Sequence, residues 1–326
     1  MNRRAILKGI TFFAALVLAG AASAAQSYPS RPIRLVVPYP PGGNVDITAR
    51  IISPGLGELL GQTIVIDNRS GAGGNLGAGL VAKANRDGYT LLMGSSGPLA
   101  INPIVYGKRM PYDSVKDFAP VSKVHVVPLV VLASNGSGID SVKTLLDRAR
   151  AAPGKVTMAS AGVGTTNHLG LELIANKAQV QFLHVPYKGS GPALAELLGN
   201  QVQTMVDQLT SSIGYVRDGR LKILAVASAR RSPALPNVPT LDESGVPGVE
   251  ASTFIGVLAP AGTPKTTINQ LNAAMVKVMA RPVVVEKLRA LGTEPGSSSP
   301  AEFEAMIRDG LAKWQGVAKS AGLRFE

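Results

Sequence analysis

The sequence predicts an α/β protein built from two doubly wound modules, each with a parallel sheet between helices. Short β-branched runs alternate with helical patterns, and glycine-rich loops lead from such a run into the next helix. The same order returns in the second half of the chain. This alternation is typical of parallel sheets, because each crossover between neighbouring strands returns through a helix.

The first module follows the N-terminal segment. Arg34–Val37 is a β-rich run, and Pro38–Asn44 must be a turn, because proline and glycine interrupt regular elements. A second glycine-rich loop is found at Ser70–Asn75. Further strands are expected at 63–66 and 89–94, with helices at 45–60 and from the second loop to about 84.

The second module repeats the pattern, and the end of the chain is mainly helical. The glycine- and threonine-rich loop Ala161–Asn167 lies between a strand and a helix. Strands are expected at 156–160, 180–185, 203–206 and 221–227, with helices at 168–178, 192–198, 266–280, 283–291 and 300–321.

The composition excludes several kinds of site. The 326 residues are 45% hydrophobic and 17% charged, which is typical of a globular protein. There is no cysteine, so disulfides, iron–sulfur clusters and cysteine nucleophiles are excluded. His125, His168 and His184 are too far apart in sequence for an HExxH or HxxH motif, so neither a metal site nor a cofactor is predicted.

The net charge of +12 permits an acidic partner, but its distribution argues against nucleic acid. The longest basic runs are pairs such as Arg230-Arg231, with acidic residues interspersed. A nucleic-acid reader gathers its basic residues on one face. We therefore expect no nucleic-acid partner.

The first 25 residues have the organisation of a signal peptide. Arg3, Arg4 and Lys8 make the beginning basic, and residues 9–25 carry no charge. Ala22-Ser23-Ala24 fits a small-x-small cleavage site, so cleavage is expected after Ala24 or Ala25. The arginine pair is compatible with the Sec route and with the twin-arginine route. Both routes place the mature chain in the periplasm.

The glycine loops indicate anion binding. A strand–glycine loop–helix unit directs free backbone N–H groups and a helix dipole at one point. Gly42–Asn44 forms one such loop and Gly162–Asn167 another, in different modules. Facing each other across a cleft, they would hold a small carboxylate. The alternative is that both are simply tight turns between strand and helix.

Enzyme motifs receive little support from the sequence. Gly77, Gly79 and Ala82 fit a loose dinucleotide fingerprint, but they lie inside an expected helix and not at its start. The chain has no GxxxxGK[ST] loop, no GxSxG elbow and no SxxK motif. His168 or Tyr187 acting beside the anion loops is the remaining enzymatic alternative.

A series of longer motifs resembles the tripartite tricarboxylate transporter substrate-binding proteins, also called the Bug receptors. The motifs appear in the same order along essentially the whole mature chain. They are Val37–Asp46, Asp67–Asn75, Asp87–Leu92, Asp117–Pro120, His184–Gly189, Pro239-Thr240 and Ala259–Pro264. Phe254, where tryptophan is frequent in the family, and Gly199-Asn200, in place of Gly-Gly, depart from the pattern.

The resemblance implies a type II periplasmic-binding-protein fold, with two doubly wound lobes that close on a ligand about two crossover strands. Lobe one would comprise 26–125 and 253–326, and lobe two 126–252. The crossovers would lie near 126–132 and 254–258. Family ligands are typically small carboxylates held by backbone N–H groups, hydroxyls and water.

The family motifs also imply the residues of the ligand site. From lobe one they are Tyr39, Gly42, Gly43, Asn44, Asp46, Ser95 and Ser96; from lobe two Ser160, Gly162, Thr165, Thr166, Asn167, Tyr187, Ser190 and Asp207. Asp46 is expected to fix its loop or cap the helix. Gly43 is expected at a positive φ, and Asp207 has a structural role as its alternative.

The predicted function is that of a monomeric periplasmic receptor, not an enzyme. It would capture a small organic acid and deliver it to the membrane permease subunits of a tripartite tricarboxylate transporter. Two alternatives stay open on the sequence: a secreted enzyme acting on a small carboxylate, and an envelope sensor whose liganded form engages a sensor kinase.

Overall fold

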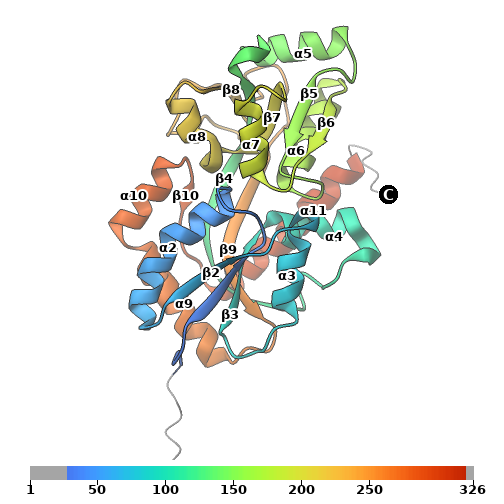
Figure 1. Cartoon of the computed structure of the whole chain (residues 1–326). Helices are drawn as coiled ribbons and strands as arrows, with labels where there is room; N and C mark the ends of the chain where they lie inside the picture. Colours follow the sequence, from blue (N-terminus) through green and yellow to red (C-terminus); the bar gives the residue numbers. More distant parts are fainter. Residues whose placement is uncertain (1–27, 321–326) are drawn as a thin grey trace, which may run out of the picture. The chain divides into compact units, whose positions relative to one another are not determined.

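The strands and helices predicted for the first module are present in the predicted order. The helix at Asn102–Tyr106 was not assigned from the sequence, and of the long strand Phe118–Ser134 only a crossover near 126–132 was expected. The computed structural model describes residues 28–320, of which Arg31–Ser320 belong to one compact unit (Figure 1). The signal-peptide prediction therefore lies outside the described residues. The elements are β1 (Ile33–Val37), α2 (Asn44–Leu60), β2 (Ile64–Asn68), α3 (Asn75–Ala82), β3 (Thr90–Ser95), α4 (Asn102–Tyr106) and β4 (Phe118–Ser134).

The second module also keeps its predicted order, with two helices that the sequence analysis did not assign. These are α5 (Val142–Ala151) and α8 (Leu209–Arg217). The other elements are β5 (Thr157–Ser160), α6 (Thr166–Ala178), β6 (Leu183–Pro186), α7 (Ser190–Leu198), β7 (Thr204–Gln208) and β8 (Leu221–Val226). The chain ends with β9 (Ser252–Pro260), α9 (Lys265–Met279), α10 (Pro282–Ala290), β10 (Glu294–Pro295) and α11 (Pro300–Ser320).

The first sheet is mixed, which corrects the prediction of a purely parallel one. β1 runs parallel to β2 and to β3, as the strand–helix–strand pattern requires. β3 then pairs antiparallel with β9, and β9 pairs antiparallel with β4. No helical crossover links β4 or β9 to the strand beside it, so the local alternation of strands and helices could not predict the direction of these two strands. β9 is buried at every position after its first, as expected for a sheet covered on both faces.

The second sheet has the same mixed character. β5 is parallel to β6 and to β7, while β4 pairs antiparallel with β7 and β8. Figure 1 shows α5, α6, α7 and α8 around these strands. β4 takes part in both sheets, so it connects them covalently.

The chain passes between the sheets at two adjacent points. On β4, Pro128 is the last residue paired with β9 and Leu129 is the first paired with β7. Beside it, the Leu129 N–H donates to the carbonyl of Ala251 at 2.9 Å, immediately before β9. The first crossing lies within the predicted 126–132. The second precedes the predicted 254–258, which is instead an internal part of β9.

Apolar side chains fill the space between sheets and helices. Leu92, Leu258 and Phe303 are fully enclosed between the first sheet and α11, and the ring of Phe254 meets that of Phe303 edge to face at 5.9 Å. Among residues 28–320, no helix has both the length and the apolar character that a membrane span needs.

Candidate functional site

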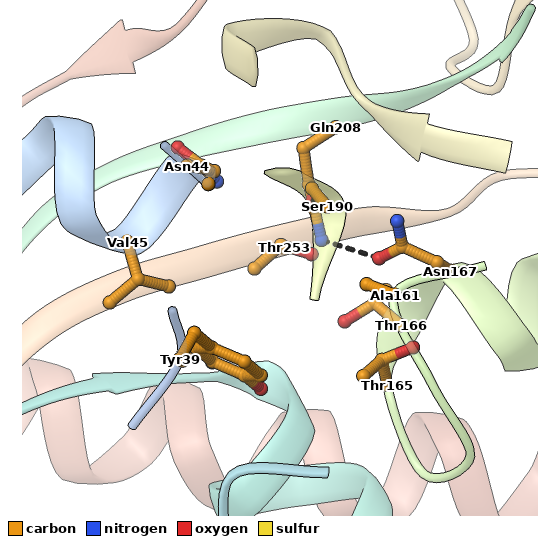
Figure 2. Close-up of a pocket in the computed structure, with 12 residues that line it drawn as sticks. Tyr39, Asn44, Val45, Ala161, Thr165, Thr166, Asn167, Ser190, Gln208 and Thr253 are labelled. Carbon is orange, nitrogen blue, oxygen red and sulfur yellow. Dashed lines mark hydrogen bonds between the residues drawn. The ribbon is translucent and has the colours of Figure 1, made fainter. Parts of the chain in front are cut away.

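A pocket lies where loops at the ends of the two sheets meet (Figure 2). All of its lining side chains are uncharged. The elements around the first sheet contribute Tyr39, Gly43, Asn44, Val45, Ser95 and Thr253, and those around the second sheet contribute Ala161, Thr165, Thr166, Asn167, Ser190 and Gln208. The cavity volume is about 30 Å³, enough for about one or two water molecules.

The N-terminus of α2 opens onto this pocket without a side-chain cap. Gly43 is the N-cap residue, and within residues 28–320 this helix start has no side-chain cap hydrogen bond. Uncapped N–H groups together with the helix dipole attract negative charge. The backbone of Gly43 is extended, with φ −86°, so the expected positive φ is wrong there. The left-handed position is Gly42, with φ +85°.

Asp46 organises this loop from behind. Its carboxylate accepts hydrogen bonds from the Gly42 N–H at 3.0 Å, Asn68 Nδ2 at 3.0 Å and Arg50 Nε at 2.9 Å. Burial alone would raise the pKa of Asp46, but these donors outweigh it and hold the pKa below its ordinary value. Because its oxygens are occupied and it lies outside the lining, Asp46 fixes the loop in the way the sequence analysis described.

Tyr39 and Ser95 form one wall of the pocket. The Tyr39 hydroxyl donates to the Gly73 carbonyl at 3.3 Å and lies 3.4 Å from Ser95 Oγ. Burial raises the pKa of Tyr39 to about 12, so its hydroxyl keeps its proton at neutral pH. Ser96 is directed elsewhere: its Oγ accepts from the Phe254 N–H at 3.0 Å and ties β3 to β9.

The second loop is closed by its own side chains. Thr165 caps α6, since its Oγ1 accepts from the His168 N–H at 3.3 Å, and its hydroxyl donates to the Gly162 carbonyl at 2.6 Å. The Gly162 N–H donates to Ser160 Oγ at 3.1 Å. The N-terminus of α6 is thus already supplied with an acceptor, unlike that of α2.

Asp207 lies behind the pocket and accepts from two of its lining residues. Asn167 Nδ2 and Ser190 Oγ donate to Asp207 Oδ1 at 3.0 Å and 2.6 Å. Ser211 Oγ donates to Oδ2 at 2.7 Å. In turn, Asn167 Oδ1 accepts from Gln208 Nε2 at 2.6 Å, the bond drawn in Figure 2. Asn167 Nδ2 also donates to the Val206 carbonyl at 2.9 Å, so the donors of Asn167 and Ser190 are directed to the protein and not to the cavity.

The structure brings part of the predicted set together. Predicted residues along the lining are Tyr39, Gly43, Asn44, Ser95, Thr165, Thr166, Asn167 and Ser190. Predicted residues outside the lining are Gly42, Asp46, Ser96, Ser160, Gly162, Tyr187 and Asp207. Val45, Ala161, Gln208 and Thr253 complete the lining and were missed. Gln208 could have been inferred as the neighbour of Asp207 at a strand end, whereas no local signal marked Thr253.

Two lining side chains have a buried polar atom that finds no partner among the described residues. They are Asn44 Nδ2 and Thr253 Oγ1, on residues that are 3% and 2% exposed. A buried polar atom left unpaired costs about 1–3 kcal/mol. Both atoms can donate a hydrogen bond. Two buried donors are therefore left on lining residues at the start of α2 and on β9.

The buried Asp207 makes the stability of the protein depend on pH. Burial raises its pKa from 3.8 to about 6, although the hydrogen bonds oppose this. Between pH about 4 and about 6 the folded protein keeps a proton that the unfolded chain has lost, so the free energy of unfolding falls as the pH rises. At neutral pH the raised pKa of Asp207 lowers the free energy of unfolding by about 3 kcal/mol, relative to a pH below 4.

We expect Asp207→Asn to remove this fall. Urea unfolding measured from pH 4 to pH 7 should show the native protein losing stability relative to the variant, by up to about 3 kcal/mol. Parallel pH profiles for the two proteins would mean that Asp207 is ionised across the whole range.

Comparisons with known proteins agree with this architecture. Residues 48–323 match the model of the tripartite tricarboxylate transporter family receptors, TctC. The structure titled "R. palustris Rpa4515 with adipate" is 39% identical, with a TM-score of 0.88 over 90% of this chain and 98% of that one. Periplasmic binding protein BugD is 34% identical, with a TM-score of 0.87 over 91% and 99%. MatC (Rpa3494) from Rhodopseudomonas palustris, solved with bound malate, is 31% identical, with a TM-score of 0.85 over 89% and 99%.

Proposed function

Because the chain belongs to the tripartite tricarboxylate transporter receptor family, whose members are periplasmic solute-binding proteins and not enzymes, we propose that it captures a small carboxylate in the pocket of Figure 2. The ligand would then be passed to the membrane permease subunits of a tripartite tricarboxylate transporter. Support comes from the relatives solved with adipate and with malate, which are both carboxylates.

The observation that carries the proposal is the pair of unpartnered donors beside an uncapped helix. One carboxylate oxygen would accept from Asn44 Nδ2 and Thr253 Oγ1. The other would accept from the free N–H groups at the start of α2. Hydrogen bonds to a charged acceptor contribute about 1.5–3 kcal/mol each, so neutral donors suffice without an arginine.

The second sheet contributes a different kind of contact. Ser190 donates its proton to Asp207, so toward the cavity its oxygen can only accept. Thr165 is likewise committed to the cap of α6 and to Gly162. We therefore assign the carboxylate to the α2 side of the pocket, and the body of the ligand, with any hydroxyl donor, to the α6 and α7 side.

The two sheets are proposed to belong to two lobes that open and close. The boundaries stay those expected from the sequence, with 126–252 as lobe two, adjusted so that the chain crosses at Pro128–Leu129 and Ala251–Ser252. In the described conformation the cavity measures about 30 Å³. A ligand would therefore enter while the lobes are apart and be enclosed when they close.

Export of the mature chain as a monomer, with cleavage after Ala24 or Ala25, completes the proposal. The export and the cleavage position rest on the charge pattern of residues 1–25, which fall outside the described part of the chain. Periplasmic relatives such as BugD support this location.

The proposed function predicts that a carboxylate stabilises the protein on binding and is released chemically unchanged. Melting temperatures should be measured with a panel of mono- and dicarboxylates and with the matching amides. At a ligand concentration of 100 times Kd, binding adds about 2.7 kcal/mol to the free energy of unfolding. Chemical conversion of the ligand during incubation would instead support an enzyme, and stabilisation by amides alone would overturn the carboxylate assignment.

A further inference from the structure

Two histidines that are distant in sequence meet a glutamate outside the pocket. His168 and Glu172 lie one helical turn apart on α6, and His184 lies on β6. One potential ligand atom from each residue lies within 4.8 Å of the other two. The sequence spacing excluded an HExxH motif, but it could not show that the fold joins a helix and a strand here.

The three side chains have the chemistry of a transition-metal site. Imidazole nitrogens with one carboxylate oxygen suit Zn²⁺ and its neighbours in the first transition row. Around a tetrahedral Zn²⁺ the ligand atoms lie about 3.4 Å apart. His168 Nε2 and Glu172 Oε1 are already 3.7 Å apart. The two imidazole rings stack, with centroids 4.6 Å apart and planes at 15°, so they must turn toward a shared ion.

Apart from Glu172, one charged side chain among the described residues lines the surface depression next to the cluster. The charged group nearest to Glu172 in the adjoining surface depression is Arg150, which lies 3.6 Å from Asp147 and is partly balanced by it.

The surroundings supply an outer hydrogen bond and an entry route. Ser160 Oγ lies 2.7 Å from His184 Nε2, and metal-bound imidazoles normally make such a bond. The same hydroxyl accepts from the Gly162 N–H in the loop next to the pocket. Glu172 also lines an open surface depression of about 630 Å³, from which an ion could reach its carboxylate.

We propose that His168, Glu172 and His184 form a binding site for a divalent transition-metal ion of the Zn²⁺ class, which fastens α6 to the edge strand β6. The fourth position would hold water, as three protein ligands leave it open. The site is separate from the ligand pocket, so it does not depend on which solute the receptor carries.

Cobalt and zinc test the site directly. Untagged mature protein should be stripped with a chelator and titrated with Co²⁺, and an absorption band near 600 nm is expected from a tetrahedral ion. Zn²⁺ should displace Co²⁺ and raise the melting temperature in a saturable manner. Both effects should disappear in His184→Gln. In Glu172→Gln the affinity for Co²⁺ and Zn²⁺ should fall at least about tenfold.

Glu196→Gln is the matched control, because this glutamate on α7 lies outside the cluster and its variant should behave like the native protein. Absence of a cobalt band and of stabilisation at millimolar Zn²⁺ would overturn the proposal, as would full zinc stabilisation in His184→Gln. Neither readout requires carboxylate binding, so failure here leaves the proposed receptor function standing.

Discussion

Gly191→Ala should weaken carboxylate binding by about tenfold or more while leaving the fold intact. Gly191 lies in the first turn of α7, and an added Cβ would come within 2.8 Å of the Pro41 carbonyl oxygen. Its φ is not in the left-handed region, so alanine fits the backbone itself. The steric clash should therefore destabilise the closed arrangement of the two lobes by about 1–3 kcal/mol, and weaken binding accordingly.

This contact belongs to a seam of close approaches between the proposed lobes. At Gly189, a Cβ would come within 2.6 Å of the Pro40 ring, and at Gly73 within 2.6 Å of the Val163 carbonyl oxygen. Gly189 and Gly73 have a positive φ, so an alanine there would also strain the backbone. Gly191 does not, and it therefore tests the contact between the lobes alone.

The measurement is calorimetric titration combined with small-angle scattering. The native protein should show a smaller radius of gyration when it is saturated with ligand, and Gly191→Ala should show a smaller decrease or none. Gly214→Ala is the control, because a Cβ there meets nothing within 4 Å. Native affinity in Gly191→Ala would mean that binding does not need this closed seam.

Thr253→Val should have opposite effects on stability and on binding. Valine has nearly the shape of threonine and suits a strand. Without ligand, the variant removes a buried hydroxyl that has no protein partner, so the free energy of unfolding should stay the same or rise. With ligand, it removes a hydrogen bond to a carboxylate, at a loss of about 1.5–3 kcal/mol, or about ten- to hundredfold in affinity.

Thr210→Val is a matched control for this prediction. Thr210 Oγ1 is also buried without a partner, but the residue lies on α8 outside the pocket lining. It should therefore retain native affinity. Lys188→Ala, which also lies outside the lining, should change affinity least. A larger loss with Lys188→Ala than with Thr253→Val would show that a cation holds the carboxylate.

Much of the fold could be predicted because its signals are local. Glycine and proline mark the turn before α2, and the helix boundaries follow from capping and apolar periodicity. The directions of β4 and β9 could not be predicted in this way. Their pairing joins residues more than 120 positions apart, such as Val126 and Phe254, and local alternation carries no information about it.

The site was predicted where its residues lie in loops that precede helices. Asn44, Thr165 and Asn167 all belong to such loops or to the first helical turn. Thr253 was missed because it lies at the start of a mostly apolar strand that reaches the pocket from a distant part of the sequence. Predicted hydroxyls can also point to protein partners, as Ser96 does toward the backbone of Phe254.

The central claim is that the pocket beside α2 holds a small carboxylate without a cationic side chain. Mass spectrometry of the small molecule released from natively purified protein tests it most directly, with Thr253→Val purified in parallel. We predict that a mono- or dicarboxylic acid is released from the native protein and is depleted in the variant. Release of a cation or of a neutral amide, or equal retention of the acid by Thr253→Val, would contradict the account.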